Sequence, residues 1–256
     1  NMPYKYSSQA NKNIARFVAE MLDIEYHVIP IEGLVKESCY VLGIYESLTG
    51  TKTKLTEAVE ENVQAKIRAI NLLSNIAQME GGIFTNNGNK NELFLGYYTN
   101  DGDGRGAISP LGDMPKDEVY RLARYMNKHV FKSTVFPAKL FKAKPSAELK
   151  EDQVDPIIVS WHCALVRAVL DYNKTSIETI LQWWLEGTLE TNLSVSTKLI
   201  KQHNLNDAKV FINDLLWFFG KFRDQAFKRV PSPPIIVLTK TAFGFDYREP
   251  MMVPFI

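Results

Sequence analysis

The chain has 256 residues, enough for one large domain or two small ones. Hydrophobic residues make up 45% of it and charged residues 23%, which is ordinary for a globular protein and excludes the disordered and low-complexity classes. With 30 basic and 29 acidic residues, the net charge of +1 gives no bulk attraction to nucleic acid or to an anionic membrane, although it leaves room for a local basic patch.

The two cysteines, Cys39 and Cys163, are too few for a disulfide framework or a four-thiolate zinc site. They indicate a reducing compartment, so we expect a cytoplasmic protein. The longest apolar stretch, Ile157 to Leu170, is too short and too polar to span a bilayer. The first residues lack the apolar stretch of a signal peptide.

The first half of the chain alternates helical and extended patterns. Three stretches carry apolar residues at helical spacing: Ser8 to Leu22, Ile31 to Leu48 and Leu55 to Met79. Short runs of β-forming residues predict strands at Tyr26 to Ile31 and at Ile83 to Thr85. Further helices are predicted to begin near Glu92 and at Pro115. This alternation predicts a doubly wound parallel α/β sheet over residues 1–150.

The second half, residues 151–256, is predicted to be a helical part of the same domain. Its helices are expected at Ile157 to Tyr172, Ser176 to Glu186, Ser194 to His203 and Asp207 to Lys228. Pro231 ends the last helix, because a proline ring cannot continue one. The charged stretch from Lys142 to Asp155 is predicted to be a mobile or ligand-ordered loop.

Three polar clusters stand where predicted strands meet predicted helices, the edge at which open α/β sheets bind ligands. The first cluster runs from Thr85 to Glu92, where backbone amides at the start of a helix would favour an anion. Glu92 could hold Mg²⁺ against nucleotide phosphates, or it could simply be the acidic first turn of a capped helix.

The second cluster, Gly96 to Gly106, has the glycines and aspartates of a calcium loop. Gly112 stands where such a loop needs its closing glutamate, so a plain surface turn is the better interpretation. The third cluster, Asp113 to Lys116, places Lys116 in the first turn of a helix, where its charge opposes the helix dipole. That placement is explained if Lys116 shares an anion with the helix start, and the alternative is simple solvation.

The remaining polar and aromatic groups have plainer interpretations. We recognise in the sequence neither the residue spacing of a metal site nor the pattern of a Ser/His/Asp catalytic triad. His162 lies in an apolar run and is predicted to be a hydrogen-bonded core histidine. Trp183-Trp184 and Trp217-Phe218-Phe219 are at helical positions and are predicted to be core or interface residues.

An ordered series of motifs resembles the synthetase domain of NAD⁺ synthetases. The series is Asn62-Val63-Gln64-Ala65-Lys66-Ile67-Arg68, Gly88-Asn89-Lys90-Asn91-Glu92-Leu93, Gly96-Tyr97-Tyr98-Thr99, Gly102-Asp103-Gly104, Pro110 to Lys116, and Pro145-Ser146-Ala147-Glu148-Leu149. The tail is similar to the glutamine-dependent branch through Phe227-Lys228-Arg229, Ser232-Pro233-Pro234 and Ala242-Phe243-Gly244. The resemblance covers nearly the whole chain and implies an adenine nucleotide alpha hydrolase-like fold.

The resemblance implies an ATP-dependent carbon–nitrogen ligase that performs the final step of NAD biosynthesis. The carboxylate of deamido-NAD attacks the α-phosphate of ATP and releases pyrophosphate. Ammonia taken from glutamine then displaces AMP from the adenylate to give NAD⁺. ATP and Mg²⁺ are the implied cofactors. The implied partners are a second copy of the domain, in a homodimer that the full-length protein could extend to a higher oligomer, and a glutaminase domain on the same chain. No nucleic acid and no membrane is implied.

The same resemblance implies roles for individual residues. It assigns ATP contacts to Ser8, Asn87, Lys116 and Ser146, deamido-NAD contacts to Lys66, Arg68, Asn100 and Lys228, and Mg²⁺ ligation to Glu92. Three of these positions depart from the family pattern. Asn100 stands where the ammonia-dependent branch has a lysine. Lys66 replaces an arginine and cannot make the same bidentate contact, and Asn87 replaces a threonine.

The family's pyrophosphate-binding loop, Ser-Gly-Gly-x-Asp-Ser, is expected before Met2 and is not in this sequence. We therefore expect a C-terminal fragment of a longer enzyme, with a sheet incomplete at its N-terminus and no activity on its own. Two alternatives stay open. One is another ATP pyrophosphatase, such as a GMP synthetase or a tRNA-modifying ligase, and the other is a non-catalytic dimerisation domain.

Overall fold

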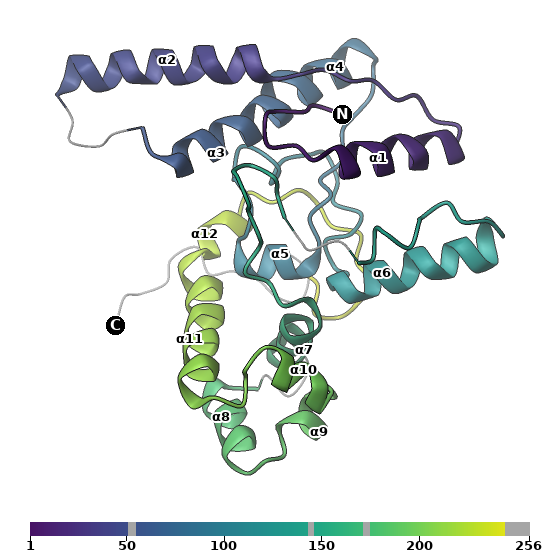
Figure 1. Ribbon diagram of the computed structural model, residues 1–256, viewed down its shortest axis with the longest axis vertical. Helices are drawn as coiled ribbons and strands as arrows, with labels where there is room; N and C mark the ends of the chain where they lie inside the picture. Colours follow the sequence, from purple (N-terminus) through teal and green to yellow (C-terminus); the bar gives the residue numbers. More distant parts are fainter. Residues whose placement is uncertain (51–54, 143–145, 171–174, 244–256) are drawn as a thin grey trace. The chain divides into compact units, whose positions relative to one another are not determined.

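A computed structural model describes residues 1–50, 55–142, 146–170 and 175–243 (Figure 1). These residues fall into two compact units that interleave along the sequence. Unit 1 comprises Asn1–Phe84, Thr99–Gly106 and Tyr120–Pro156, and unit 2 comprises Thr85–Tyr98, Ala107–Val119 and the residues from Ile157 onward. The predicted division into residues 1–150 and 151–256 stays a prediction, because compactness alone does not define a functional part.

Unit 1 is built mainly from helices whose ends are set by local capping. Its elements are α1 (Gln9–Met21), α2 (Glu32–Thr49), α3 (Glu57–Lys66), η1 (Ile67–Leu73), α4 (Ser74–Met79), the later part of α6 (Lys116–Tyr125) and η2 (Met126–Val130). The hydroxyl of Ser8 accepts a hydrogen bond from Asn11 N and so caps α1, as the sequence predicts. Gly50 ends α2 in the left-handed conformation, with a φ of 59°.

The elements α3, η1 and α4 follow one another without a break, which confirms the predicted long helix over Leu55 to Met79 except for its first two residues. Its middle, Ile67–Leu73, is π-helical, and such segments are rare and often mark functional positions. The helix stops before Gly81, whose φ of 64° is readily adopted only by glycine.

The predicted strand at Tyr26 to Ile31 lies beside the N-terminal segment of unit 1. The Asn1 nitrogen donates to the His27 carbonyl oxygen at 2.6 Å, and Ile29 N donates back to the Asn1 carbonyl oxygen at 2.8 Å. Ile31 N then donates to the Pro3 carbonyl oxygen at 3.1 Å, which is the alternation of a parallel pair. Because Pro3 has no N–H, the pair cannot continue as a regular ladder.

A small core closes unit 1 between the long helix and α2. Tyr4, Ile31, Val35 and Ile67 are buried there, with Val63 and Leu72 packed against them. Each fully buried aliphatic side chain of this kind contributes about 1.5–3 kcal/mol to folding.

Unit 2 carries the helices of the second half of the chain. Its elements are α5 (Lys90–Leu95), the start of α6, α7 (Val159–Leu170), α8 (Ile177–Leu185), α9 (Leu189–Leu193), α10 (Thr197–Gln202), α11 (Ala208–Asp224) and α12 (Ala226–Arg229). The predicted single helix over Ser194 to His203 is wrong at its start. Ser194 has a φ of 53° and ends α9, so α10 begins only after Ser196, which caps it.

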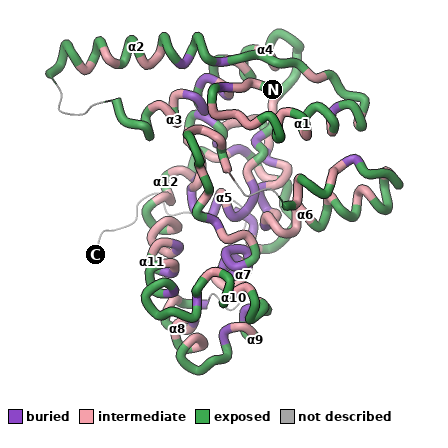
Figure 2. The backbone as a smooth tube through the Cα atoms, viewed as in Figure 1, coloured by how far each residue is buried: buried purple, intermediate pink, exposed green. Residues whose placement is uncertain are grey.

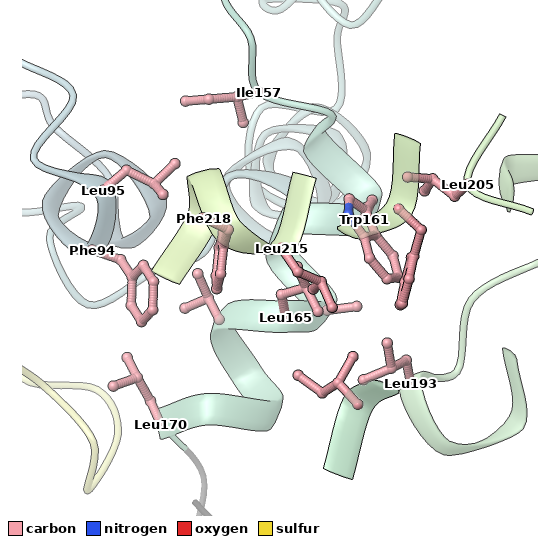
Figure 3. Packing of buried hydrophobic residues seen from close by; sticks show 14 of the residues in the cluster. Phe94, Leu95, Ile157, Trp161, Leu165, Leu170, Leu193, Leu205, Leu215 and Phe218 are labelled. Atoms are coloured by element: carbon pink, nitrogen blue, oxygen red, sulfur yellow. The ribbon is translucent and has the colours of Figure 1, made fainter. Parts of the chain in front are cut away.

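The core of unit 2 gathers residues from α5, α7, α9 and α11 (Figure 3). Phe94 of α5 stacks on Phe218 of α11 with ring centroids 4.7 Å apart, and Trp161 of α7 packs near Phe211 of α11. Burial of His162 confirms the predicted core histidine: its Nδ1 accepts from Ile158 N at 2.9 Å, and its Nε2 lies 3.2 Å from a carboxylate oxygen of Asp214. Trp184, stacked on Phe211, confirms the predicted core role of the tryptophan pair.

The predicted parallel sheet is present only as fragments among the described residues. Unit 2 has two isolated parallel bridges, Thr85 with Ile108 and Ser109 with Ile235, so the segment at 108–109 lies between the other two. No longer strand is formed within the described ranges. The prolines Pro110 and Pro234 flank these bridges and offer no N–H, which limits the ladders on that side. None of the described helices is long and apolar enough to cross a bilayer.

Candidate functional site

In unit 2, three consecutive residues of α5 contact the start of α6 and the turn before it. The Lys90 ammonium lies 2.7 Å from a carboxylate oxygen of Asp113. The Asn91 side-chain oxygen accepts from Lys116 N at 3.1 Å, and Glu92 Oε1 accepts from Lys116 Nζ at 3.2 Å. The structure therefore brings together Glu92 and Lys116, which the sequence places in two separate clusters.

Glu92 also belongs to a capping box at the start of α5. The Asn89 side-chain oxygen accepts from Asn91 N and Glu92 N, and Glu92 Oε2 accepts from Asn89 N at 3.0 Å. This confirms the capped-helix interpretation of the cluster. About a quarter of the Glu92 side chain (23%) is exposed to solvent.

The ion pair of Lys90 and Asp113 is almost fully buried, with side-chain exposures of 4% and 0%. Lys90 Nζ donates to the hydroxyls of Thr239 and Thr241 as well, each at 3.1 Å. Asp113 accepts from the backbone nitrogens of Leu238 and Thr239 with its other oxygen. Every donor of the ammonium thus has a partner, and the segment 238–241 is tied to the start of α5.

The turn before α5 is shaped by Asn86. Its buried side-chain oxygen accepts from Gly88 N at 2.9 Å and from the Ser109 hydroxyl at 3.1 Å. A Cβ on Gly88 would lie only 2.9 Å from that oxygen, so a larger residue would have to displace the Asn86 side chain. Asn87, one of the predicted ATP contacts, is exposed, and its side-chain oxygen accepts from the Thr85 hydroxyl.

Lys228, a predicted deamido-NAD contact, is engaged at the other end of α5. Its ammonium donates to the carbonyl oxygens of Gly96 and Tyr98, both at 2.8 Å. A cation is favourable at this negative end of the helix. Gly96 has a φ of 59°, and a Cβ there would lie 2.3 Å from Gln225 Cβ, so only glycine fits.

Unit 1 carries the other predicted site residues. Glu148 joins two of them: its carboxylate accepts from Ser8 N at 3.0 Å and from the Asn11 amide at 2.7 Å, while Glu148 N donates to the Ser146 hydroxyl at 3.1 Å. Ser8 and Ser146 are therefore grouped around one carboxylate. Pro145, which opens the same motif, lies outside the described residues.

Lys66 and Arg68 are not brought together. They are two residues apart on one helix, so they face different directions, and Lys66 is exposed whereas Arg68 is half-buried. Arg68 Nε donates to the Met2 carbonyl oxygen at 3.0 Å. Burial lowers the pKa of the Arg68 guanidinium, and the negative charges of Asp103 and Glu148 partly offset that shift.

Asn100 lies in a turn that is docked on α3. The Thr99 hydroxyl donates to the Asn62 side chain at 2.7 Å, and Thr99 N donates to Asp103 at 2.8 Å. A Cβ on Gly102 would lie 2.7 Å from Ala65 Cβ, so this glycine permits the close contact. The described residues include no group of three or more His, Cys, Asp or Glu able to hold a metal ion.

Gln64 is a candidate that the sequence interpretation missed. Its side chain is fully buried, and its Nε2 donates to the Leu149 carbonyl oxygen at 2.8 Å. Its Oε1 has no hydrogen-bond partner among the described residues, although a buried carbonyl oxygen normally has one. The only signal in the sequence was the position of this glutamine inside the Asn62 to Arg68 motif. The burial of its side chain could not be inferred from that position.

A separate cavity of about 500 Å³ lies among α7, α8, α9 and α10 of unit 2. Arg167, Trp183 and Asn192 contribute to its lining, together with Asp117. It contains none of the predicted site residues.

Comparisons with known proteins identify the family. The sequence model of the NAD synthase family matches residues 1–210. A glutamine-dependent NAD(+) synthetase of Aquifex aeolicus is 30% identical over 251 residues, which are 98% of this chain and 38% of that protein. The chain thus spans about two fifths of the length of this relative.

Solved structures agree in fold. The structure of a glutamine-dependent NAD(+) synthetase from Cytophaga hutchinsonii matches with a TM-score of 0.71 at 16% identity, over 99% of this chain and 38% of that chain. A glutamine-dependent NAD+ synthetase from Acinetobacter baumannii, solved with adenosine diphosphate, matches with a TM-score of 0.50 at 23% identity, over 82% of this chain and 35% of that chain.

The fold is therefore the one that NAD synthetases share. The chain belongs to the NAD synthase family, which confirms the predicted resemblance.

Proposed function

We propose that this chain is the synthetase part of a glutamine-dependent NAD⁺ synthetase. It would activate the carboxylate of deamido-NAD with ATP, release pyrophosphate, and let ammonia displace AMP from the adenylate to give NAD⁺. The observation that carries the proposal is the family match over residues 1–210, supported by a relative of that name that aligns with 98% of the chain. This match favours an NAD⁺ synthetase over the alternative of a GMP synthetase.

The geometry of α5 supports a role in binding nucleotide phosphates. Lys116 carries a positive charge at the start of α6, and its backbone and side chain are both held by α5. Phosphoryl chemistry depends mainly on fixed positive charge near the phosphates. We assign Lys116 and Asn87 to contacts with ATP in unit 2. Ser8 and Ser146, grouped around Glu148, are assigned to ATP in unit 1.

Gln64 joins this assignment as a further ATP contact. Its unpartnered Oε1 can accept a hydrogen bond, and a nucleobase amino group is a suitable donor. The neighbour solved with adenosine diphosphate supports an adenine nucleotide as the ligand.

Mg²⁺ fits Glu92 as one of its ligands. Proteins usually hold this ion with one or two carboxylates, while phosphate oxygens and water complete the shell. Glu92 supplies one carboxylate next to Lys116. The ion would offset negative charge on the phosphates, while the capping box keeps the Glu92 side chain in place.

Deamido-NAD is assigned to Lys66, Arg68, Asn100 and Lys228. The Lys66 side chain is exposed, so it can contact an anionic ligand without rearrangement. Arg68 and Lys228 already donate to backbone carbonyl oxygens, so they would contact a ligand through their remaining N–H groups.

We further propose a cytoplasmic homodimer in which a glutaminase domain of the same protein supplies the ammonia. Exposed apolar side chains on α2 and on the long helix support the dimer. These are Leu34, Val41, Tyr45 and Leu48 of α2 and Val59, Ile70, Leu73 and Met79 of the long helix. Exposed large apolar side chains are often covered at an interface between subunits. Light scattering of the natural protein that carries this sequence tests it: twice the chain mass is expected, and a monomer at high concentration contradicts it.

The function is tested by a coupled NAD⁺ assay on the natural protein that carries this sequence. Deamido-NAD, ATP, Mg²⁺ and excess ammonium salt are supplied, and NAD⁺ is read out with alcohol dehydrogenase. We expect NAD⁺ formation that stops when either ATP or deamido-NAD is omitted. If nicotinate mononucleotide or xanthosine monophosphate is amidated in place of deamido-NAD, the substrate assignment is wrong.

A further inference from the structure

The segment between Glu118 and Glu148 contains no acidic residue, although the chain as a whole is almost neutral. Its basic residues are Arg121, Arg124, Lys128, Lys132, Lys139, Lys142 and Lys144. We call residues 120–142, which lie entirely within unit 1, the basic arm. The arm comprises the later part of α6, η2 and the segment that follows.

The charged side chains of the basic arm are on its surface. All of its Lys and Arg residues are exposed, in keeping with the exposed and intermediate colours along α6 (Figure 2). Lys128, Lys132, Lys139 and Lys142 form no ion pair with any other described residue. Their positive charge is therefore not neutralised within the described part of the chain.

Uncharged contacts hold the basic arm together. Asn127 and Phe136 are joined by two hydrogen bonds, from the Asn127 amide to the Phe136 carbonyl oxygen at 2.8 Å and from Phe136 N to the Asn127 side-chain oxygen at 2.9 Å. Tyr120 packs edge-on against Phe141, and Val135 is buried. The lysines take no part in these contacts. A need to hold the fold of the arm together therefore does not explain why lysines occupy these positions.

The basic arm leads directly into a predicted ATP contact. Lys142 and Ser146 are four residues apart, so their Cα atoms are at most about 15 Å apart by chain length alone. The Debye length is about 30 Å at 10 mM salt, about 8 Å at 0.15 M and about 3 Å at 1 M. The field of the arm therefore reaches Ser146 at low ionic strength and is screened at high ionic strength.

We propose that the basic arm attracts anionic nucleotides to the site and raises their association rate without touching them in the bound state. This rests on the proposed function, because ATP and deamido-NAD are the anions in question. Clustered charge of one sign can raise association rates by about 10–10³-fold, and the effect falls steeply with salt. A flexible, solvated lysine suits this role, since steering requires charge and no fixed hydrogen bond.

The test measures the association rate of a fluorescent ATP analogue by stopped flow, using the natural protein and a Lys128→Glu/Lys139→Glu variant. We expect the variant to associate about three- to tenfold more slowly at 10 mM salt and almost equally fast at 0.5 M salt. The dissociation rate and the melting temperature should stay close to those of the natural protein. A Lys198→Glu/Lys209→Glu variant is the matched control, because it makes the same change in net charge on exposed residues of unit 2.

The outcomes separate this proposal from the proposed function. NAD⁺ formation by the natural protein together with an unchanged association rate in the arm variant overturns the steering role alone. An equal slowing in the control variant also overturns it, because net charge would then suffice. Binding of single-stranded RNA that the arm variant loses, with the nucleotide rate unchanged, would assign the arm to a different polyanion and overturn it as well.

Discussion

Asn91 and Lys116 are 25 residues apart in sequence, yet the side-chain oxygen of Asn91 accepts a hydrogen bond from the backbone nitrogen of Lys116 at 3.1 Å. Asn91 thereby satisfies a backbone donor at the start of α6, a group that a helix cannot satisfy by itself. The same contact fixes where the Lys116 side chain begins, and its ammonium then reaches Glu92.

Glu92→Gln should lower NAD⁺ formation by about 10²–10³-fold while changing stability little. A glutamine at this position can keep the capping box, because its side-chain oxygen still accepts from Asn89 N. What is lost is the negative charge beside the phosphates and the metal. The assay is turnover at saturating ATP and Mg²⁺, with urea unfolding as the measure of stability.

Glu118→Gln is the control for that experiment. Glu118 is another acidic residue in the first turn of α6, and it accepts from Arg167 at 3.1 Å. It has no role in the proposed site, so turnover should stay within about twofold of the natural protein. Equal losses in the two variants would remove Glu92 from the site.

Asp113→Asn should destabilise the protein by about 3–5 kcal/mol, because it leaves the Lys90 ammonium buried without a counter-charge. Removing both charges in Lys90→Met/Asp113→Asn should cost less than the two single changes added together. Urea unfolding monitored by tryptophan fluorescence gives the free energies. A single variant as stable as the natural protein would show that the pair is not buried in solution.

Gly96→Ala should destabilise unit 2 by more than about 1 kcal/mol, because alanine disfavours a φ of 59° and its Cβ would meet Gln225. Gly43→Ala is the matched control. Gly43 is inside α2, and a Cβ there meets no atom within 4 Å, so the helix should gain about 0.5–1 kcal/mol. Thermal unfolding of both variants gives the comparison, and a neutral Gly96→Ala would contradict the left-handed conformation.

Cys163 should make the protein less stable as the pH rises above about 9. Burial raises the pKa of its thiol to about 12 in the folded state, while an unfolded thiol titrates near 8.5. The unfolded chain therefore releases its proton first, and stability present below pH 8.5 is lost as the pH rises toward 12, by up to about 1.4 kcal/mol per pH unit. A Cys163→Ala variant should show a shallower loss between pH 9 and 11. An identical slope in both proteins would contradict the burial of this thiol.

Local signals in the sequence predicted most helices, because the groups that start and stop a helix are close in sequence. Ser8, Ser176 and Asp207 each cap the predicted helix that follows. The error at Ser194 arose because this helix end has no such local signal. A serine in the left-handed conformation has no distinctive sequence signal, so the end of α9 was not visible.

The site could be predicted only in part, for a related reason. The motifs indicated Glu92 and Lys116, but not the hydrogen bonds that join α5 to the start of α6. Gln64 and Leu149 are 85 residues apart, and the buried partners of Lys90 at Thr239 and Thr241 are farther still. Contacts of this range depend on tertiary packing, which no local pattern encodes. The extent of the predicted sheet was also beyond local patterns, because the residues that pair, Thr85 with Ile108 and Ser109 with Ile235, are far apart in sequence.

The most direct test of the central claim is ³¹P NMR of the nucleotide products when the natural protein acts on deamido-NAD, ATP, Mg²⁺ and ammonia. The account predicts AMP and pyrophosphate in equal amounts, each matching the NAD⁺ formed, because the carboxylate is activated at the α-phosphate. Release of ADP and inorganic phosphate, or consumption of ATP with no NAD⁺, would contradict it.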